Sequence, residues 1–177
     1  MPYVYHRVPS SPVGQMLEPL NRLKETQPEL YAQHTRKYQG REWLLQRQIE
    51  RLGCLWNDVI HTSPVPPQRV YAALRQAGWQ KRFPTAWYRI DVVTMGFSEA
   101  NTVIYYSGSH PSQARFEPFA IEKLADMDTL PAATFAYYRQ QIEAGAAPLL
   151  FHQVPHILHR GALPIDALET IRVDVVS

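Results

Sequence analysis

The chain has 177 residues, of which 45% are hydrophobic and 19% are charged, a balance typical of a globular protein with a sizeable core. Its 18 basic and 16 acidic residues give a formal charge of +2, which does not indicate a nucleic-acid or membrane surface. The single cysteine, Cys54, excludes an internal disulfide, and the apolar runs are far shorter than the ~20 residues of a membrane span. We therefore expect one cytoplasmic domain over residues 1–177, without a signal peptide.

Hydrophobic periodicity, together with proline and glycine signals, predicts short strands that alternate with helices. Strands are expected at 3–8, 54–61, 87–93, 102–106, 148–154 and 171–176, with a further short strand at 116–121. Helices are expected at 14–24 (in two pieces, because of Pro19), 28–38, 41–52, 67–77 and 131–144, with helical turns at 122–127 and 164–168. The polar segment 107–115 is predicted to be a surface loop, and the short link 96–101 favours an antiparallel connection. This order predicts an α+β fold of about six short, largely antiparallel strands with helices inserted between them.

The segment from Cys54 to Pro67 combines an apolar strand pattern with a thiol, an indole, an amide, a carboxylate and an imidazole. Buried polar groups need partners, so this density indicates either a hydrogen-bonded structural network or one wall of a site. On a strand, Asn57 and His61 would share one face, while Trp56 and Asp58 would share the other. We expect this strand to be central in its sheet, with one of the two faces lining a site.

Histidines supply the other candidates. His6 lies within the first predicted strand, where it either faces water at a sheet edge or serves a site; in the latter case the Asn57–His61 face should lie beside it. His152, His156 and His159 are close in sequence, but no cysteine or carboxylate nearby completes a ligand set, so we expect no metal site. Hydrogen-bonded histidines at a strand-to-loop crossing are the alternative. Cys54 lacks an adjacent cation and is expected to be a buried, inert thiol.

Two resemblances follow from these patterns. The chain resembles a family of uncharacterised bacterial proteins, a similarity that implies no activity and is carried by the segments 5–9, 19–23, 37–42, 54–59 and 148–156. More distantly, the Tyr5-His6 pair on a first strand, the helical insertion and the second strand entering a proline-rich turn are similar to the ADP-ribosyltransferase fold. The DNA-modifying toxins and the RNA 2′-phosphotransferases of that fold are the most similar branches.

The second resemblance implies that NAD is the ligand and that His6 binds its nicotinamide ribose region. It places the 56–61 strand against the nicotinamide, and Arg7 on ribose hydroxyls and phosphate. The catalytic acid of that family belongs at the start of the penultimate strand, where this chain has no carboxylate between Ala146 and Leu150. Asp58 or Glu143 would then have to supply it.

Two function hypotheses follow. One is a binder of NAD or an ADP-ribose-type nucleotide, or a transferase acting at a ribose anomeric carbon. Its catalytic candidates are His6, Asp58 and Glu143, and its substrate-binding candidates are Arg7, Trp56, Asn57, His61 and His152. The other is a non-enzymatic protein–protein interaction or immunity-type module. The first predicts polar groups converging in a cleft, and the second predicts a flat, aromatic and arginine-rich patch.

Overall fold

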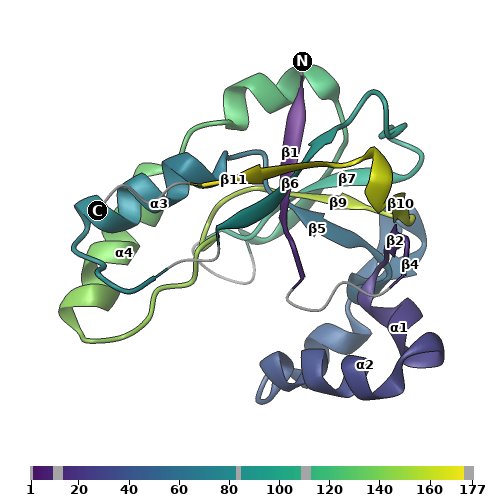
Figure 1. The fold of residues 1–177 in the computed structure, drawn as a ribbon, viewed down its shortest axis with the longest axis horizontal. Helices are drawn as coiled ribbons and strands as arrows, with labels where there is room; N and C mark the ends of the chain where they lie inside the picture. Colours follow the sequence, from purple (N-terminus) through teal and green to yellow (C-terminus); the bar gives the residue numbers. More distant parts are fainter. Residues whose placement is uncertain (1, 10–13, 83–84, 109–112, 174–177) are drawn as a thin grey trace.

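Two antiparallel sheets form the frame of the computed structural model, which describes residues 2–9, 14–82, 85–108 and 113–173 (Figure 1). The three-stranded sheet has the order β1 (Tyr3–Arg7), β6 (Ala86–Asp91) and β11 (Glu169–Arg172). The four-stranded sheet has the order β5 (Ile60–Thr62), β9 (His156–His159), β7 (Thr102–Tyr106) and β8 (Arg115–Pro118). Two small two-stranded sheets pair β2 (Met16–Leu17) with β10 (Leu163–Pro164), and β3 (Gln48–Ile49) with β4 (Cys54–Leu55). The predicted α+β class is confirmed.

The main core lies between the two larger sheets. In the three-stranded sheet Val4 is paired with Ile90, and both side chains are fully buried. The same apolar cluster contains Ile104 and Ile157 from the four-stranded sheet. Burying each of these aliphatic side chains contributes roughly 1.5–3 kcal/mol, so the core fixes the two sheets against each other.

An isolated β-bridge joins the two sheets, from the middle of β1 to the residue that follows β5. The backbone N–H of Tyr5 donates to the carbonyl of Ser63 at 2.8 Å, and the N–H of Ser63 donates back to the carbonyl of Tyr5 at 2.9 Å. This bridge brings His6 beside His61, although 55 residues separate them.

Two helices lie on one side of the sheets (Figure 1); the first was predicted from its amphipathic pattern, and the second from its leading proline and closing glycine. They are α3 (Pro67–Gln76) and α4 (Ala132–Glu143), and each begins beside a proline that is compatible with a helix start. A second core cluster under them contains Leu74, Trp87 and Tyr138. The Trp87 indole N–H donates to the Tyr71 hydroxyl at 3.1 Å, which satisfies the buried indole.

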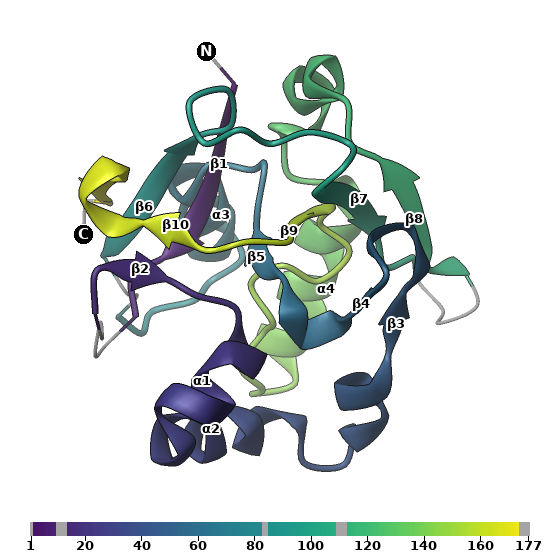
Figure 2. The same cartoon turned by 90° about the vertical axis from the view of Figure 1, so that its right-hand side faces the viewer.

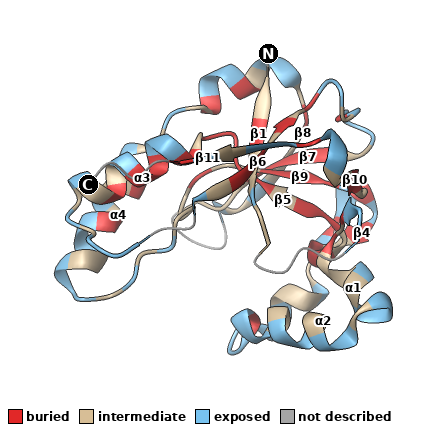
Figure 3. Cartoon of the chain, in the orientation of Figure 1, coloured by how far each residue is buried: buried red, intermediate tan, exposed pale blue. Residues whose placement is uncertain are grey.

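A helical pair lies away from α3 and α4. It consists of α1 (Leu20–Thr26) and α2 (Pro28–Thr35), and the 3₁₀ turn η1 (Arg36–Tyr38) follows it (Figure 2). No residue of α1 or α2 is buried, and Figure 3 shows this pair almost entirely in the intermediate and exposed classes. The predicted helix at 28–38 is thus confirmed over most of its length. At 14–24, only the part after Pro19 is helical, and Met16–Leu17 forms a strand instead.

The predicted helix at 41–52 and the predicted strand at 54–61 are wrong. The first region contains the 3₁₀ turns η2 (Glu42–Gln46) and η3 (Glu50–Leu52) on either side of β3, which returns into β4 through Gly53 at φ 58°. The second is interrupted by the 3₁₀ turn η4 (Trp56–Asp58), because the Asp58 carboxylate accepts the Leu55 backbone N–H at 2.7 Å and closes a turn. β5, which follows, lies at the edge of its sheet and not at the centre.

The predicted strand at 148–154 is also wrong, because the strand begins only at His156. Side chains of α4 form hydrogen bonds with backbone carbonyls of the segment before β9. Thr134 donates to the His152 carbonyl at 2.8 Å, and Tyr138 donates to the Leu150 carbonyl. Gln153 has a φ of 59°, which is unusual for a residue other than glycine.

The remaining expectations concern connections and chain ends. β6 and β7 lie in different sheets, so the link 96–101 does not join a paired hairpin. The 3₁₀ turns η6 (Ile121–Met127) and η7 (Ile165–Ala167) agree with the predicted helical turns. Parts of the predicted loop at 107–115 and of the predicted strand at 171–176 lie outside the described residues. Within the described residues, none of the helices is both long and apolar enough to cross a bilayer.

Candidate functional site

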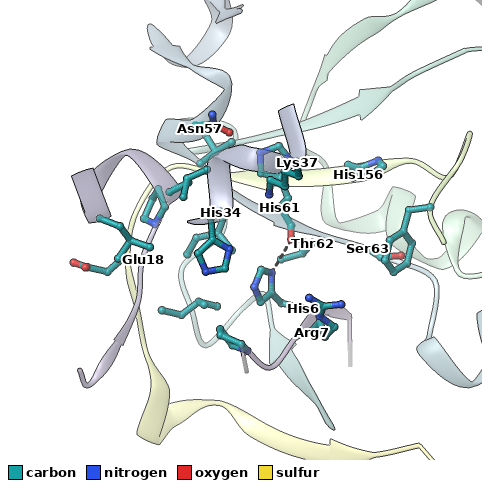
Figure 4. Close-up of a pocket in the computed structure, with 18 of the residues that line it drawn as sticks. His6, Arg7, Glu18, His34, Lys37, Asn57, His61, Thr62, Ser63 and His156 are labelled. Atoms are coloured by element: carbon teal, nitrogen blue, oxygen red, sulfur yellow. Dashed lines mark hydrogen bonds between the residues drawn. The ribbon is translucent and has the colours of Figure 1, made fainter. Parts of the chain in front are cut away.

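A cavity of about 620 Å³ opens between the helical pair, the ends of β1 and β5, and the segment before β9 (Figure 4). This volume lies within the range of about 300–1,000 Å³ that is usual for small-molecule sites. Its polar lining comes from elements far apart in sequence: His6, Arg7, Glu18, His34, Lys37, Asn57, His61, Thr62, Ser63 and His156. Leu20, Leu23 and Leu30 of the helical pair form an apolar wall.

His6 is held in one tautomer. Its Nδ1 lies 2.8 Å from the His61 carbonyl oxygen, which can only accept, so Nδ1 carries the proton and Nε2 keeps its lone pair (Figure 4). Burial lowers the pKa of His6, and the neighbouring Arg7 lowers it further, despite the hydrogen bond to the carbonyl. The ring is therefore neutral at pH 7.

His61 and His156 are each also held in one tautomer by a hydrogen bond to a backbone carbonyl. His61 Nε2–H donates to the Trp56 carbonyl at 2.9 Å, and His156 Nδ1–H donates to the Val154 carbonyl at 2.8 Å. Burial lowers the pKa of His61 to about 3 and that of His156 to about 4. His6, His61 and His156 are thus three neutral imidazoles of the cavity, each with one ring nitrogen that can accept a hydrogen bond, and His34 is the fourth histidine of its lining.

Positive charge in the cavity comes from Arg7 and Lys37. Among the described residues, no carboxylate forms an ion pair with either of them. Burial lowers the pKa of Lys37, and the charges of Arg7 and Arg41 lower it further. Glu18 is the one carboxylate in the lining, and it lies 3.6 Å from Arg22. The cavity therefore favours an anionic ligand.

Asn57 is almost fully buried in the wall. Its Oδ1 accepts the Tyr38 hydroxyl at 2.7 Å, which ties η4 to the end of the helical pair. Its Nδ2 has no hydrogen-bond partner within the described chain. Leaving such a donor unsatisfied costs about 1–3 kcal/mol, a cost typical of residues kept for a site.

The predicted separation of Asn57 and His61 from Trp56 and Asp58 is wrong, because η4 replaces the strand. Trp56, Asn57 and His61 all line the cavity, with the Trp56 and His61 rings edge to face at 4.6 Å. Asp58 does not line it. Its carboxylate accepts the Leu55 N–H and the Asn21 side-chain amide, each at 2.7 Å, and is committed to the turn.

The other candidates fall in different places. His6 and Arg7 line the cavity, as expected of neighbours of the His61 region. Glu143 is exposed on α4, 3.7 Å from Arg139, and does not line the cavity. His152 lines a smaller adjoining cavity of about 370 Å³ and stacks on Tyr137 with ring centroids 3.8 Å apart.

Sequence reasoning missed Lys37, His34 and His156 as members of the site. Lys37 belongs to a basic cluster in the sequence that has the pattern of a solvated helix face. For His156 the sequence offers a metal ligand or a hydrogen-bonded histidine at a strand-to-loop crossing, and neither interpretation predicts a place in this cavity. Within the part of the chain that the structure describes, no three His, Cys, Asp or Glu residues are grouped to hold a metal ion.

No protein-family model, curated protein or solved structure matches the chain.

Proposed function

We propose that the protein binds an anionic nucleotide-type ligand of the NAD or ADP-ribose class in this cavity and acts at the ribose anomeric carbon. One observation carries the proposal: Arg7 and Lys37, which form no ion pair with a carboxylate of the described chain, lie beside three neutral histidines in a cavity of nucleotide size. The resemblance to ADP-ribosyltransferases leads to the same ligand class.

The phosphates of such a ligand are matched by the two cations. The Arg7 guanidinium offers a planar pair of donors that fits phosphate oxygens in a bidentate manner, and the Lys37 ammonium offers a point charge. Neither cation has to leave an ion pair within the described chain before it binds. Charge-assisted hydrogen bonds of this kind contribute about 1.5–3 kcal/mol each.

The ribose hydroxyls are matched by the imidazoles. A hydroxyl can donate to His6 Nε2, His61 Nδ1 or His156 Nε2, because the other nitrogen of each ring is already bound to a carbonyl. The leucines of the helical pair offer an apolar surface for a base or nicotinamide ring. Anion, polyol and ring are the three parts of a nucleotide.

The carboxylate that would offset positive charge at the anomeric carbon is not supplied by Asp58 or Glu143 in this arrangement. Asp58 is committed to η4, and Glu143 is exposed on α4. Glu18 does reach the cavity, and we assign it as the carboxylate available for this role.

The interaction-module hypothesis has less support. It predicts a flat, aromatic and arginine-rich patch, and the exposed Trp43 near Arg47 is a feature of that kind. The polar groups instead converge in a cavity, which favours a small-molecule ligand.

Calorimetry with ADP-ribose and NAD tests the proposal, with adenosine as the uncharged comparator. We expect Arg7→Gln to weaken ADP-ribose binding about 10- to 100-fold, because it removes a charge-assisted contact. The matched control is Arg172→Gln, which removes an exposed strand arginine that does not line the cavity. If the wild-type protein gives no heat with either nucleotide, the proposal fails.

A further inference from the structure

The main cavity and the smaller cavity meet at a common wall. Leu149, Leu150, Phe151 and His156 line both of them. Two ligands held on either side of this wall would be closest at these four residues. A reaction between them would take place there.

His156 is the titratable residue among these four. It is the first residue of β9, and its ring lies between Tyr105 and Phe151, with centroids 6.1 Å and 6.2 Å away. Its Nδ1–H is bound to the Val154 carbonyl, so Nε2 is the nitrogen left to accept a proton. Among the described residues that line the smaller cavity none carries a carboxylate, so Glu18 would have to act from the main cavity.

The rest of the wall is held in place by α4. Tyr138 donates to the Leu150 carbonyl, Thr134 donates to the His152 carbonyl at 2.8 Å, and the Leu149 N–H donates to the Tyr137 hydroxyl at 3.2 Å. These three side-chain contacts to backbone groups of residues 149, 150 and 152 give the wall a defined position between the two spaces.

The smaller cavity has its own polar character. Arg41 lines it and forms no ion pair with a carboxylate of the described chain; its side chain donates to the Lys37 carbonyl at 2.9 Å. Ser107 also lines it, and its hydroxyl oxygen is buried without a hydrogen-bond partner among the described residues. The Arg41 guanidinium matches an anionic molecule.

We propose that His156 is a catalytic residue at this junction and that the smaller cavity holds the acceptor, a hydroxyl-bearing anion or, in its absence, water. This inference rests on the proposed NAD binding in the main cavity. The acceptor oxygen forms a bond to the ribose anomeric carbon while the bond from that carbon to the nicotinamide nitrogen breaks. The bonding pair leaves with the nicotinamide, and the acceptor proton passes to His156 Nε2 and then to solvent.

Water is the simplest acceptor for a test. NAD and water then give nicotinamide, ADP-ribose and a proton, and nicotinamide release measures the reaction. We expect His156→Gln to lower release about 100-fold or more, a loss much larger than the change in NAD affinity measured by calorimetry. His159→Gln is the matched control: it alters the same strand, at a ring that stacks on Phe97 and lines neither cavity. It should retain the wild-type release rate once folding is verified.

A second measurement does not depend on turnover. Diethyl pyrocarbonate modifies neutral imidazoles, and site-resolved mass spectrometry should show that saturating NAD protects His156 in the wild-type protein. The inference is overturned if His156→Gln releases nicotinamide at the wild-type rate, if NAD leaves His156 unprotected, or if the wild type binds NAD without cleaving it. In the last case the binding proposal stands, whereas absence of NAD binding defeats the proposed function itself.

Discussion

At the scale of single residues, His61 couples folding to pH. Its burial lowers its pKa to about 3, against 6.5 for a free histidine. Between these two values the unfolded chain binds a proton that the folded chain does not, so the free energy of unfolding decreases as the pH falls through this range. We expect His61 to account for a loss of about 2 kcal/mol between pH 7 and pH 5.

Urea denaturation of the wild type and of His61→Gln at both pH values measures this effect. The variant should be less stable at pH 7, because the Trp56 carbonyl loses its imidazole donor. Between pH 7 and pH 5, its free energy of unfolding should also decrease less than that of the wild type, and the difference should equal the contribution of His61. Other buried histidines, such as His159, titrate in both proteins and cancel in the comparison. Equal losses in the two proteins would contradict the assignment.

The residues of the site could be predicted from the sequence only where they are concentrated locally. Trp56, Asn57 and His61 were candidates because polar groups are dense in an apolar stretch, and all three line the cavity. Lys37 and His156 enter the site through contacts with distant segments. No local pattern distinguishes Lys37 from a lysine on a solvated helix face. Likewise, no local pattern distinguishes His156 from an ordinary histidine in a strand.

At the scale of elements, a side-chain hydrogen bond ties the helical pair α1–α2 to the body. Neither helix buries a residue, and their leucines face the cavity instead of the core. Asn21 anchors α1 by donating to Asp58 at 2.7 Å. We expect Asn21→Ala to cost about 1 kcal/mol and to speed amide exchange across 20–35, because few other contacts hold the pair.

Hydrogen exchange followed by mass spectrometry tests this, with Glu25→Ala as the control at an exposed position of α1. The exchange of α3, which packs in the second core cluster, should stay as in the wild type. Faster exchange throughout the molecule, or an equal effect of Glu25→Ala, would contradict a specific role for the Asn21–Asp58 contact.

Elements with clear sequence signals at their ends could be predicted. Elements whose bounds depend on a hydrogen bond from a side chain outside the element could not. α3 and α4 combine apolar periodicity with a leading proline, and both were predicted close to their observed bounds. The break in the 54–61 strand depends on the Asp58 carboxylate returning to the Leu55 N–H. The late start of β9 depends on hydroxyls of α4 that hold the segment before it.

At the scale of the whole molecule, the cavity unites the two sheets. β1 contributes His6 and Arg7 from the three-stranded sheet, while β5 and β9 contribute His61 and His156 from the other. The α+β class could be predicted from the alternation of short strands and helices in the sequence. The order of the strands in the sheets could not. Pairing such as that of β6 with β1 instead of β7 is decided by long-range packing, which periodicity does not encode.

Because both sheets contribute to the cavity, a ligand bound there should stabilise the entire fold and not one part of it. At 100 times its dissociation constant, ADP-ribose should add about 2.7 kcal/mol to the free energy of unfolding. For a domain of this length that corresponds to a rise in Tm of about 5–10 °C.

Scanning calorimetry should show a single transition that moves as a whole. The rise should be absent with adenosine and smaller for Arg7→Gln at the same ADP-ribose concentration, because that variant binds more weakly. A melt with two phases, only one of which moves with ADP-ribose, would contradict a cavity shared by both sheets. The bridge between Tyr5 and Ser63 is the physical reason to expect one phase, since it joins the sheets directly beside His6 and His61.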